Sequence, residues 1–90
     1  EANKIAGRWS VYPNPAGEKF TLSIDMKQAV KGTLRLFSPA GLTVYSSPVT
    51  LNAGANATEI STVSLPVGIY TLRLSSPEGL NIITKLVKIR

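Results

Sequence analysis

The C-terminal part of the chain alternates between apolar and polar side chains in the way that is typical of a β-hairpin. From Tyr70 to Ser75 every second residue is apolar, which predicts a strand with one buried face. The Ser-Pro-Glu-Gly sequence at 76–79 favours a tight turn, because proline presets one backbone angle and glycine accepts a positive φ. The strand that follows, Leu80–Arg90, is apolar on both faces, so we expect it to be covered on both sides or bulged. Its faces carry Ile83, Val87 and Ile89 on one side and Leu80, Ile82 and Leu86 on the other.

Shorter alternating stretches predict further strands, separated by sequences rich in proline, glycine, asparagine and serine. The expected strands are residues 9–12, 20–25, 33–37, 42–45, 49–51, 58–60, 70–75 and 80–90. Ser46–Pro48 is expected to break the chain, and Asn52–Ala57 is expected to be a loop. No stretch has the period of an amphipathic helix. The pattern predicts an all-β fold, a small antiparallel β-sandwich of about seven strands.

One ten-residue sequence occurs twice. Thr33–Leu42 and Thr71–Leu80 are identical at eight of ten positions. The repetition predicts two hairpins with the same turn and the same pair of inward leucines, in facing or adjoining sheets. Two copies do not indicate a solenoid, because that architecture stacks at least three repeats.

The length of 90 residues corresponds to one small domain. We expect residues 1–9 to be a flexible lead-in and residues 10–90 to form the domain. The hydrophobic fraction of 43% argues against disorder, and the absence of cysteine excludes disulfides and thiolate metal sites. No apolar run reaches the length that spans a bilayer, so a membrane-spanning chain is not expected.

The net charge is +5, and the basic residues are scattered along the sequence except at its C-terminal end. A nucleic-acid-binding domain would be expected to carry a denser basic stripe interleaved with aromatic residues. We therefore expect no nucleic-acid partner. An acidic polysaccharide or an anionic lipopolysaccharide stays open as a partner.

The residue types needed for common catalytic sites are missing. The chain has no histidine and no cysteine, which removes the usual general bases, thiol nucleophiles and imidazole ligands. Its few carboxylates form no close pair in the sequence, and no serine lies in a nucleophile-elbow motif. We expect no enzymatic activity, no metal and no cofactor, and we interpret the chain as a binding, structural or sorting module.

The sequence Leu65-x-x-Gly68-x-Tyr70 is similar to the tyrosine corner of immunoglobulin-like sandwiches, in which a tyrosine hydroxyl bonds to nearby backbone. The alternative is that Tyr70 is an ordinary core residue at the start of a strand. The pattern leaves both interpretations open.

Three stretches in order resemble a known family. Val11–Ala16 is similar to the opening motif of the type A C-terminal sorting domains of the type IX secretion system (Por secretion system) of Bacteroidetes. Leu34–Phe37 followed by Gly41–Tyr45 is similar to the central motif, and Leu65–Tyr70 with Thr84–Lys88 is similar to the last two. The resemblance covers about residues 11–90.

The resemblance implies a seven-stranded immunoglobulin-like sandwich at the end of a larger secreted protein. Such a domain directs its cargo from the periplasm through the outer-membrane translocon to the cell surface or the medium. A surface sortase usually removes the domain and joins the cargo to an anionic lipopolysaccharide. Some relatives keep the domain as a fixed part of the secretion machinery.

Both the resemblance and the basic, doubly apolar terminal strand point to the C-terminus as the docking element, with an unpaired strand edge and a charged end. The Pro-Asn-Pro sequence would set the entry into the fold. The candidate residues for recognition by the translocon or the sortase are Pro13, Asn14, Pro15, Gly41, Gly68, Tyr70, Lys85, Leu86, Val87, Lys88, Ile89 and Arg90.

Two other functions remain open. One is a retained domain of the secretion machinery or a surface protein that binds lipopolysaccharide or partner proteins. The other is an accessory carbohydrate-binding or adhesive sandwich, for which Trp9 is the best exposed aromatic candidate. An exposed terminal strand would also allow weak dimerisation.

Overall fold

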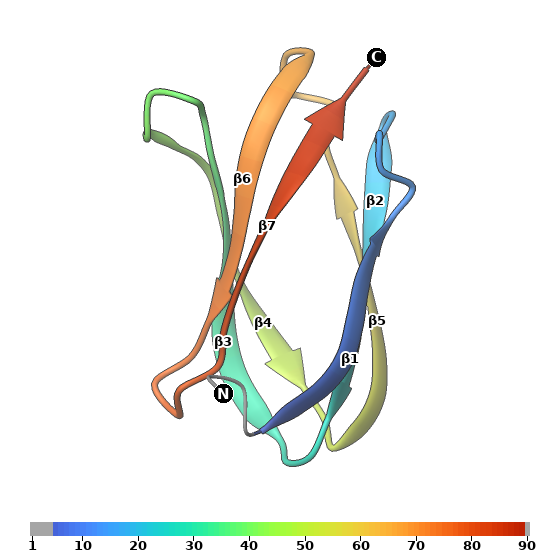
Figure 1. Ribbon diagram of the computed structural model, residues 1–90, viewed down its shortest axis with the longest axis vertical. Helices are drawn as coiled ribbons and strands as arrows, with labels where there is room; N and C mark the ends of the chain where they lie inside the picture. The colour runs from blue at the N-terminus through green and yellow to red at the C-terminus, as the bar shows by residue number, and fades with distance from the viewer. Residues whose placement is uncertain (1–4, 90) are drawn as a thin grey trace.

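The computed structural model describes residues 5–89, which form seven strands in two sheets (Figure 1). The strands are β1 (Ala6–Tyr12), β2 (Lys19–Met26), β3 (Val30–Phe37), β4 (Thr43–Leu51), β5 (Gly54–Ser61), β6 (Gly68–Ser75) and β7 (Asn81–Lys88). One sheet has the order β1-β2-β5 and the other the order β4-β3-β6-β7, and all neighbouring strands are antiparallel. The predicted all-β sandwich of about seven strands is confirmed.

The fourth strand decides the kind of sandwich. In immunoglobulin constant domains the fourth strand pairs with the fifth and gives a four-plus-three arrangement. Here β4 pairs with β3 instead, so the three-stranded sheet lacks it and the other sheet has four strands. As a result β4 and β7 are the two edges of the larger sheet, and β1 and β5 are the edges of the smaller one.

The core lies between the sheets and follows the period-two pattern of the sequence. In β2, β3 and β6 every second side chain is buried, as expected for strands with one face against a second layer. The inward leucines of the repeat, which are Leu34, Leu36, Leu72 and Leu74, are fully buried. Burial of such side chains contributes about 1.5–3 kcal/mol each and is the main source of stability.

The two copies of the repeat lie side by side in one sheet (Figure 1), and the prediction that they would occupy facing or adjoining sheets is wrong. β3 pairs with β6 so that Arg35 lies opposite Arg73, with leucine pairs on either side. Antiparallel pairing of two identical sequences in this register creates an approximate twofold axis between the two arginines. The same inward leucines then meet across the strands and add to one core.

The two turns of the repeat have the same hydrogen bonds. In each turn the amide of the glycine, Gly41 or Gly79, donates to the carbonyl oxygen of the first serine, Ser38 or Ser76. The serine hydroxyl oxygen accepts the amide of the leucine that follows the glycine. Both glycines have positive φ, 88° and 105°, a conformation that side chains disfavour. The predicted identity of the turns is therefore confirmed.

Three strands extend into stretches that were expected to be a lead-in, a chain break or a loop. β1 begins at Ala6 rather than Trp9, within the stretch expected to be a lead-in. β4 is continuous through Ser46–Pro48, because a proline without an amide proton is tolerated in an edge strand. β5 includes Gly54–Ala57, which was expected to be a loop, because these residues pair with β2 as far as Met26. In each case pairing with a neighbour overrides weak local strand propensity.

The last strand, β7, is neither covered on both sides nor bulged, so that expectation is wrong. It pairs with β6 in continuous register along its whole length. Ile82 and Leu86 are buried on the inner face, whereas Ile83 on the outer face is 57% exposed. A sandwich has two layers only, so nothing in the described residues covers the outer side of the strand.

Tyr70 forms a tyrosine corner, which is one of the two interpretations that the sequence allowed. Its hydroxyl donates to the carbonyl oxygen of Pro66, four residues earlier, and the side chain is buried. The bond connects the start of β6 to the loop before it. Tyr70 therefore has a specific polar contact in addition to its place in the core.

We expect Tyr70→Phe to lower the free energy of unfolding by about 1 kcal/mol, because the Pro66 carbonyl loses its donor while the ring stays in place. Urea denaturation of both proteins measures the difference. Tyr45→Phe is the matched control, since no hydrogen bond of the Tyr45 hydroxyl occurs among the described residues and Tyr45 is only half-buried. Equal losses in the two variants would contradict a specific role for the Tyr70 bond.

Candidate functional site

The Pro-Asn-Pro turn lies against the last strand, although the two are about seventy residues apart in the sequence. The Asn14 side-chain amide donates to the carbonyl oxygen of Lys85 at 2.9 Å, and its Oδ1 accepts the amide of Val87 at 3.0 Å. The peptide bonds Tyr12–Pro13 and Asn14–Pro15 are both cis. One asparagine side chain thus makes the two bonds that a neighbouring strand would make to the edge of β7.

Ala16 continues this contact with its backbone. Its amide donates to the carbonyl oxygen of Val87 at 2.6 Å, and its carbonyl accepts the amide of Ile89 at 3.0 Å. Ala16 also forms an isolated parallel bridge with Lys88 and has no exposed surface. The turn is therefore a short parallel partner for the end of β7, and we call the unit formed by residues 13–16 and 85–89 the terminal clasp.

The terminal clasp corrects the predicted docking element. The edge of β7 was expected to be unpaired, but the outward backbone groups of Lys85, Val87 and Ile89 bond to Asn14 and Ala16. Lys88 was expected to be part of a charged end, yet it is only 4% exposed. The reason is its position, because Lys88 alternates with Val87 and falls on the inner face of the strand. Lys85 and Ile89 are exposed.

Most of the other predicted residues surround the terminal clasp. Gly68 lies opposite Lys88 and Tyr70 lies opposite Leu86 in the pairing of β6 with β7. Gly41 does not join them, because it lies in the turn between β3 and β4, and β4 is the far edge of the sheet. Arg90 lies outside the described residues.

Thr62, which the sequence analysis did not single out, attaches a second loop to the same region. It is fully buried, its hydroxyl donates to the carbonyl oxygen of Gly17 at 2.7 Å, and its amide donates to that of Glu18 at 2.8 Å. Thr62 follows β5 directly, and Gly17 follows Ala16 of the clasp. In the sequence it is a threonine between Ser61 and Val63, in a stretch with no regular alternation, which gives no hint of burial.

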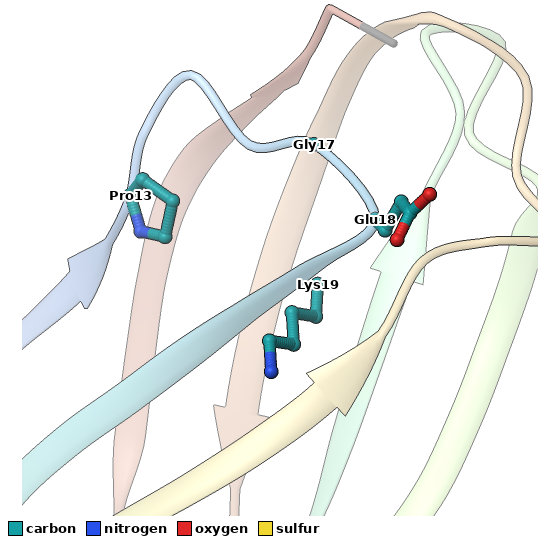
Figure 2. Close-up of a pocket in the computed structure, with 4 residues that line it drawn as sticks. All are labelled: Pro13, Gly17, Glu18 and Lys19. Atoms are coloured by element: carbon teal, nitrogen blue, oxygen red, sulfur yellow. The ribbon is translucent and has the colours of Figure 1, made fainter.

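A hollow lies beside the clasp, between the turn and the start of β2. It is lined by Pro13, Gly17, Glu18 and Lys19 (Figure 2). The Glu18 and Lys19 side chains point in different directions, and the Lys19 ammonium lies 3.1 Å from a Glu59 carboxylate oxygen. The hollow therefore has no paired carboxylates and no nucleophile with a base, and it does not form an acid–base site.

The exposed aromatic residues do not form a carbohydrate platform. Trp9 pairs with Ile24 and Tyr12 pairs with Thr21, so by strand alternation the two aromatics lie on opposite faces of β1. Trp9 is 38% exposed. Two stacked sugars need aromatic rings on one surface, and β1 does not supply them.

Residues 5–89 contain no cluster of three or more potential metal-ligating side chains. Over the same part of the chain, no helix has the length and apolar character needed to cross a membrane.

Comparison with known proteins agrees with the resemblance of the motifs. The family model described as the secretion system C-terminal sorting domain matches residues 10–89. No curated protein matches the chain. The family is one of sorting signals that are not catalytic in themselves and that are carried by secreted or cell-surface proteins. The terminal clasp thus joins the first and last motifs of the matched region, and the chain belongs to the family of type IX secretion C-terminal sorting domains.

Proposed function

We propose that this domain directs a larger cargo protein through the type IX outer-membrane translocon, and that the secretion machinery recognises the domain by binding the terminal clasp. The observation that carries the proposal is the pair of bonds from Asn14 to Lys85 and Val87. These bonds form only when the first and the last strands have both folded. A machine that recognises the clasp therefore accepts a completed domain and rejects an unfinished one.

Within the clasp, the candidate residues divide into two kinds. Pro13, Asn14, Pro15, Lys85 and Ile89 are exposed and offer atoms to a partner. Leu86 and Lys88 are buried and hold the shape of the surface from inside the clasp, and the buried Tyr70 supports them from the neighbouring strand β6. Val87 is half-buried, and its backbone amide and carbonyl already bond to Asn14 and Ala16. The charge that a partner would meet on the clasp comes from Lys85.

After export, a surface sortase removes the domain from its cargo and joins the cargo to an anionic lipopolysaccharide. This order follows the behaviour that the family resemblance implies. The cargo passes through the periplasm and ends at the outer-membrane surface or in the medium. Removal of the domain is a separate step from its recognition. The location of the cargo therefore reports recognition, and the mass of the cargo reports removal.

The test is a transfer experiment. Residues 1–90 are placed behind a signal peptide and a fluorescent reporter in a Bacteroidetes host with an intact type IX system, and in a matched host that lacks the translocon. We expect surface display or release of the reporter in the first host only, and intact mass reports whether the domain is removed. Retention of a folded fusion in the periplasm of both hosts would reject the proposal.

A second arm tests the clasp itself. Ile89→Asp replaces an exposed apolar side chain with a charged one. The hydrogen bond from the backbone amide of residue 89 to the carbonyl oxygen of Ala16 can still form. We expect export to fall about tenfold if the side chain meets a desolvated partner surface. Val63→Asp, at an exposed residue outside every strand, is the control, and unchanged export of folded Ile89→Asp would count against recognition of the clasp.

A further inference from the structure

The outer face of the four-stranded sheet has two arginines at its centre. Arg35 in β3 and Arg73 in β6 lie directly opposite each other, on the approximate twofold axis of the repeat. Strand alternation places both on the outer face, because the residues on either side of each are buried leucines. Directly opposed side chains in a sheet have Cβ atoms about 4.5–5.5 Å apart.

The charge on this face is uncompensated. The face carries Lys31, Arg35, Arg73 and Lys85, and no strand of this sheet contains an acidic residue. Among the described residues, neither Arg35 nor Arg73 has a carboxylate partner, and the Arg73 Nε–H donates to Oδ1 of Asn81 at 3.3 Å. Like charges directly opposite in a sheet are destabilising. The fold therefore holds a repulsive pair that an anionic group from outside would relieve.

Apolar side chains lie beside the arginines on the same face. Ile83 is opposite Arg73 in β7, and Ile69 lies further along β6. They are 57% and 53% exposed. Lys85 is diagonal to Arg73, since it pairs with Thr71. The face thus combines guanidinium groups with apolar area that solvent reaches, which is the composition of a protein interface and its hot spots.

We propose that this face, defined as Arg35, Arg73, Ile83, Ile69 and Lys85, binds an acidic protein surface of the secretion machinery. A carboxylate of the partner sits between Arg35 and Arg73, where two planar guanidinium groups supply the bidentate donors that carboxylates match. Apolar side chains of the partner cover Ile69 and Ile83. A sugar–phosphate headgroup would satisfy the arginines but would leave the isoleucines exposed, so the face fits a protein better than a lipopolysaccharide.

This inference rests on the proposed function and adds a second contact, because the face lies on the outside of the sheet whereas the clasp lies at its edge. Recognition of the clasp does not require binding at the outer face of the sheet. The two are therefore separable by substitution.

The first test is Arg73→Glu in the reporter fusion. The substitution turns the repulsive pair into an attractive one with Arg35, so we expect the melting temperature to rise by about 1–5 °C. Export is expected to fall about tenfold, because an acidic partner now meets a carboxylate. A residue with a merely structural role would not lower export while raising stability.

The double variant Arg35→Glu with Arg73→Glu keeps a like-charge pair and reverses the face completely. Its matched control is Arg8→Glu with Lys27→Glu, which changes the net charge equally at exposed positions outside the four-stranded sheet. We expect export to fall more than about tenfold in the first and less than about twofold in the second. Equal export of both folded variants would overturn the inference.

A photocrosslinking residue at Thr71, which is exposed on this face, identifies the partner during export. We expect an adduct with a component of the translocon, and we expect this adduct to be absent when the double variant Arg35→Glu with Arg73→Glu carries the same crosslinker.

A sedimentation experiment tests the alternative of a lipid partner. Purified domain is sedimented with vesicles of phosphatidylglycerol and with extracted lipopolysaccharide. Arginine-dependent sedimentation without a protein adduct would overturn a protein partner, and failure of the parental fusion to be exported would reject the proposed function itself.

Discussion

Replacement of Gly32 by alanine is expected to lower the free energy of unfolding by about 2–3 kcal/mol, the usual cost of overpacking a close contact. Gly32 is buried in β3, and a Cβ added there would lie 2.6 Å from the carbonyl oxygen of Ser75. That atom belongs to the backbone of β6 and cannot rotate away as a side chain does. Relief requires β3 and β6 to separate near the end of their pairing, where Thr33 lies opposite Ser75.

For a domain of this size the loss corresponds to a fall in melting temperature of about 10–20 °C, which differential scanning calorimetry measures. Gly68→Ala is the matched control, because a Cβ at Gly68 meets nothing within 4 Å and the residue has no positive φ. We expect it to be close to neutral for stability. Comparable losses in the two variants would contradict the close approach at Gly32.

The same control separates folding from recognition. Gly68 was predicted to be a recognition residue and lies opposite Lys88 beside the terminal clasp. Since Gly68→Ala is expected to fold normally, any loss of export in that variant reports contact with the machinery. Loss of export in Gly32→Ala would instead follow its loss of stability.

Replacement of Asn14 by alanine is expected to lower the free energy of unfolding by about 2 kcal/mol, because two hydrogen bonds to the edge of β7 are lost. The amide of Val87 loses its acceptor and the carbonyl of Lys85 loses its donor. We expect hydrogen exchange at the Val87 amide to accelerate by more than the global loss of stability explains, because the end of the strand opens locally. Urea denaturation and exchange measured by NMR give the two quantities.

Gln28→Ala is the matched control, since Gln28 is exposed in the turn between β2 and β3, and its side chain has no hydrogen bond within the described residues. It is expected to change neither quantity. Asn14→Asp is not expected to restore the clasp, because a carboxylate has no proton to donate to the Lys85 carbonyl. Unchanged exchange at Val87 in Asn14→Ala would show that the terminal strand does not depend on the clasp.

The period-two pattern was sufficient for the strands whose inner faces are strongly apolar. In β2, β3 and β6 the alternation coincides with burial, because a side chain every second residue faces the other layer. It was insufficient for β4 and β5. Ser46–Pro48 and Gly54–Ala57 have weak local preference for strands, and they are extended because β3 and β2 offer them backbone partners.

The candidate site was predictable as a set of motifs but not as an arrangement. The Pro-Asn-Pro sequence and the terminal strand were both singled out, and most of the residues chosen lie in or beside the terminal clasp. The edge of β7 was nevertheless expected to be open. An asparagine between two prolines indicates a turn, but nothing local indicates that its side chain completes the edge of a strand about seventy residues later.

Local order along this chain, meaning which residues alternate, where turns with glycine occur and which ten residues are repeated, already predicted an antiparallel sandwich, and the resemblance of its motifs indicated the family to which it belongs. The sandwich was predictable because alternation and turn chemistry depend on residues that are close together in the sequence. Long-range pairing decided the rest. Only the folded chain brings Asn14 to Val87, buries Lys88 and sets Arg35 opposite Arg73, since these contacts depend on register and on which strands become edges.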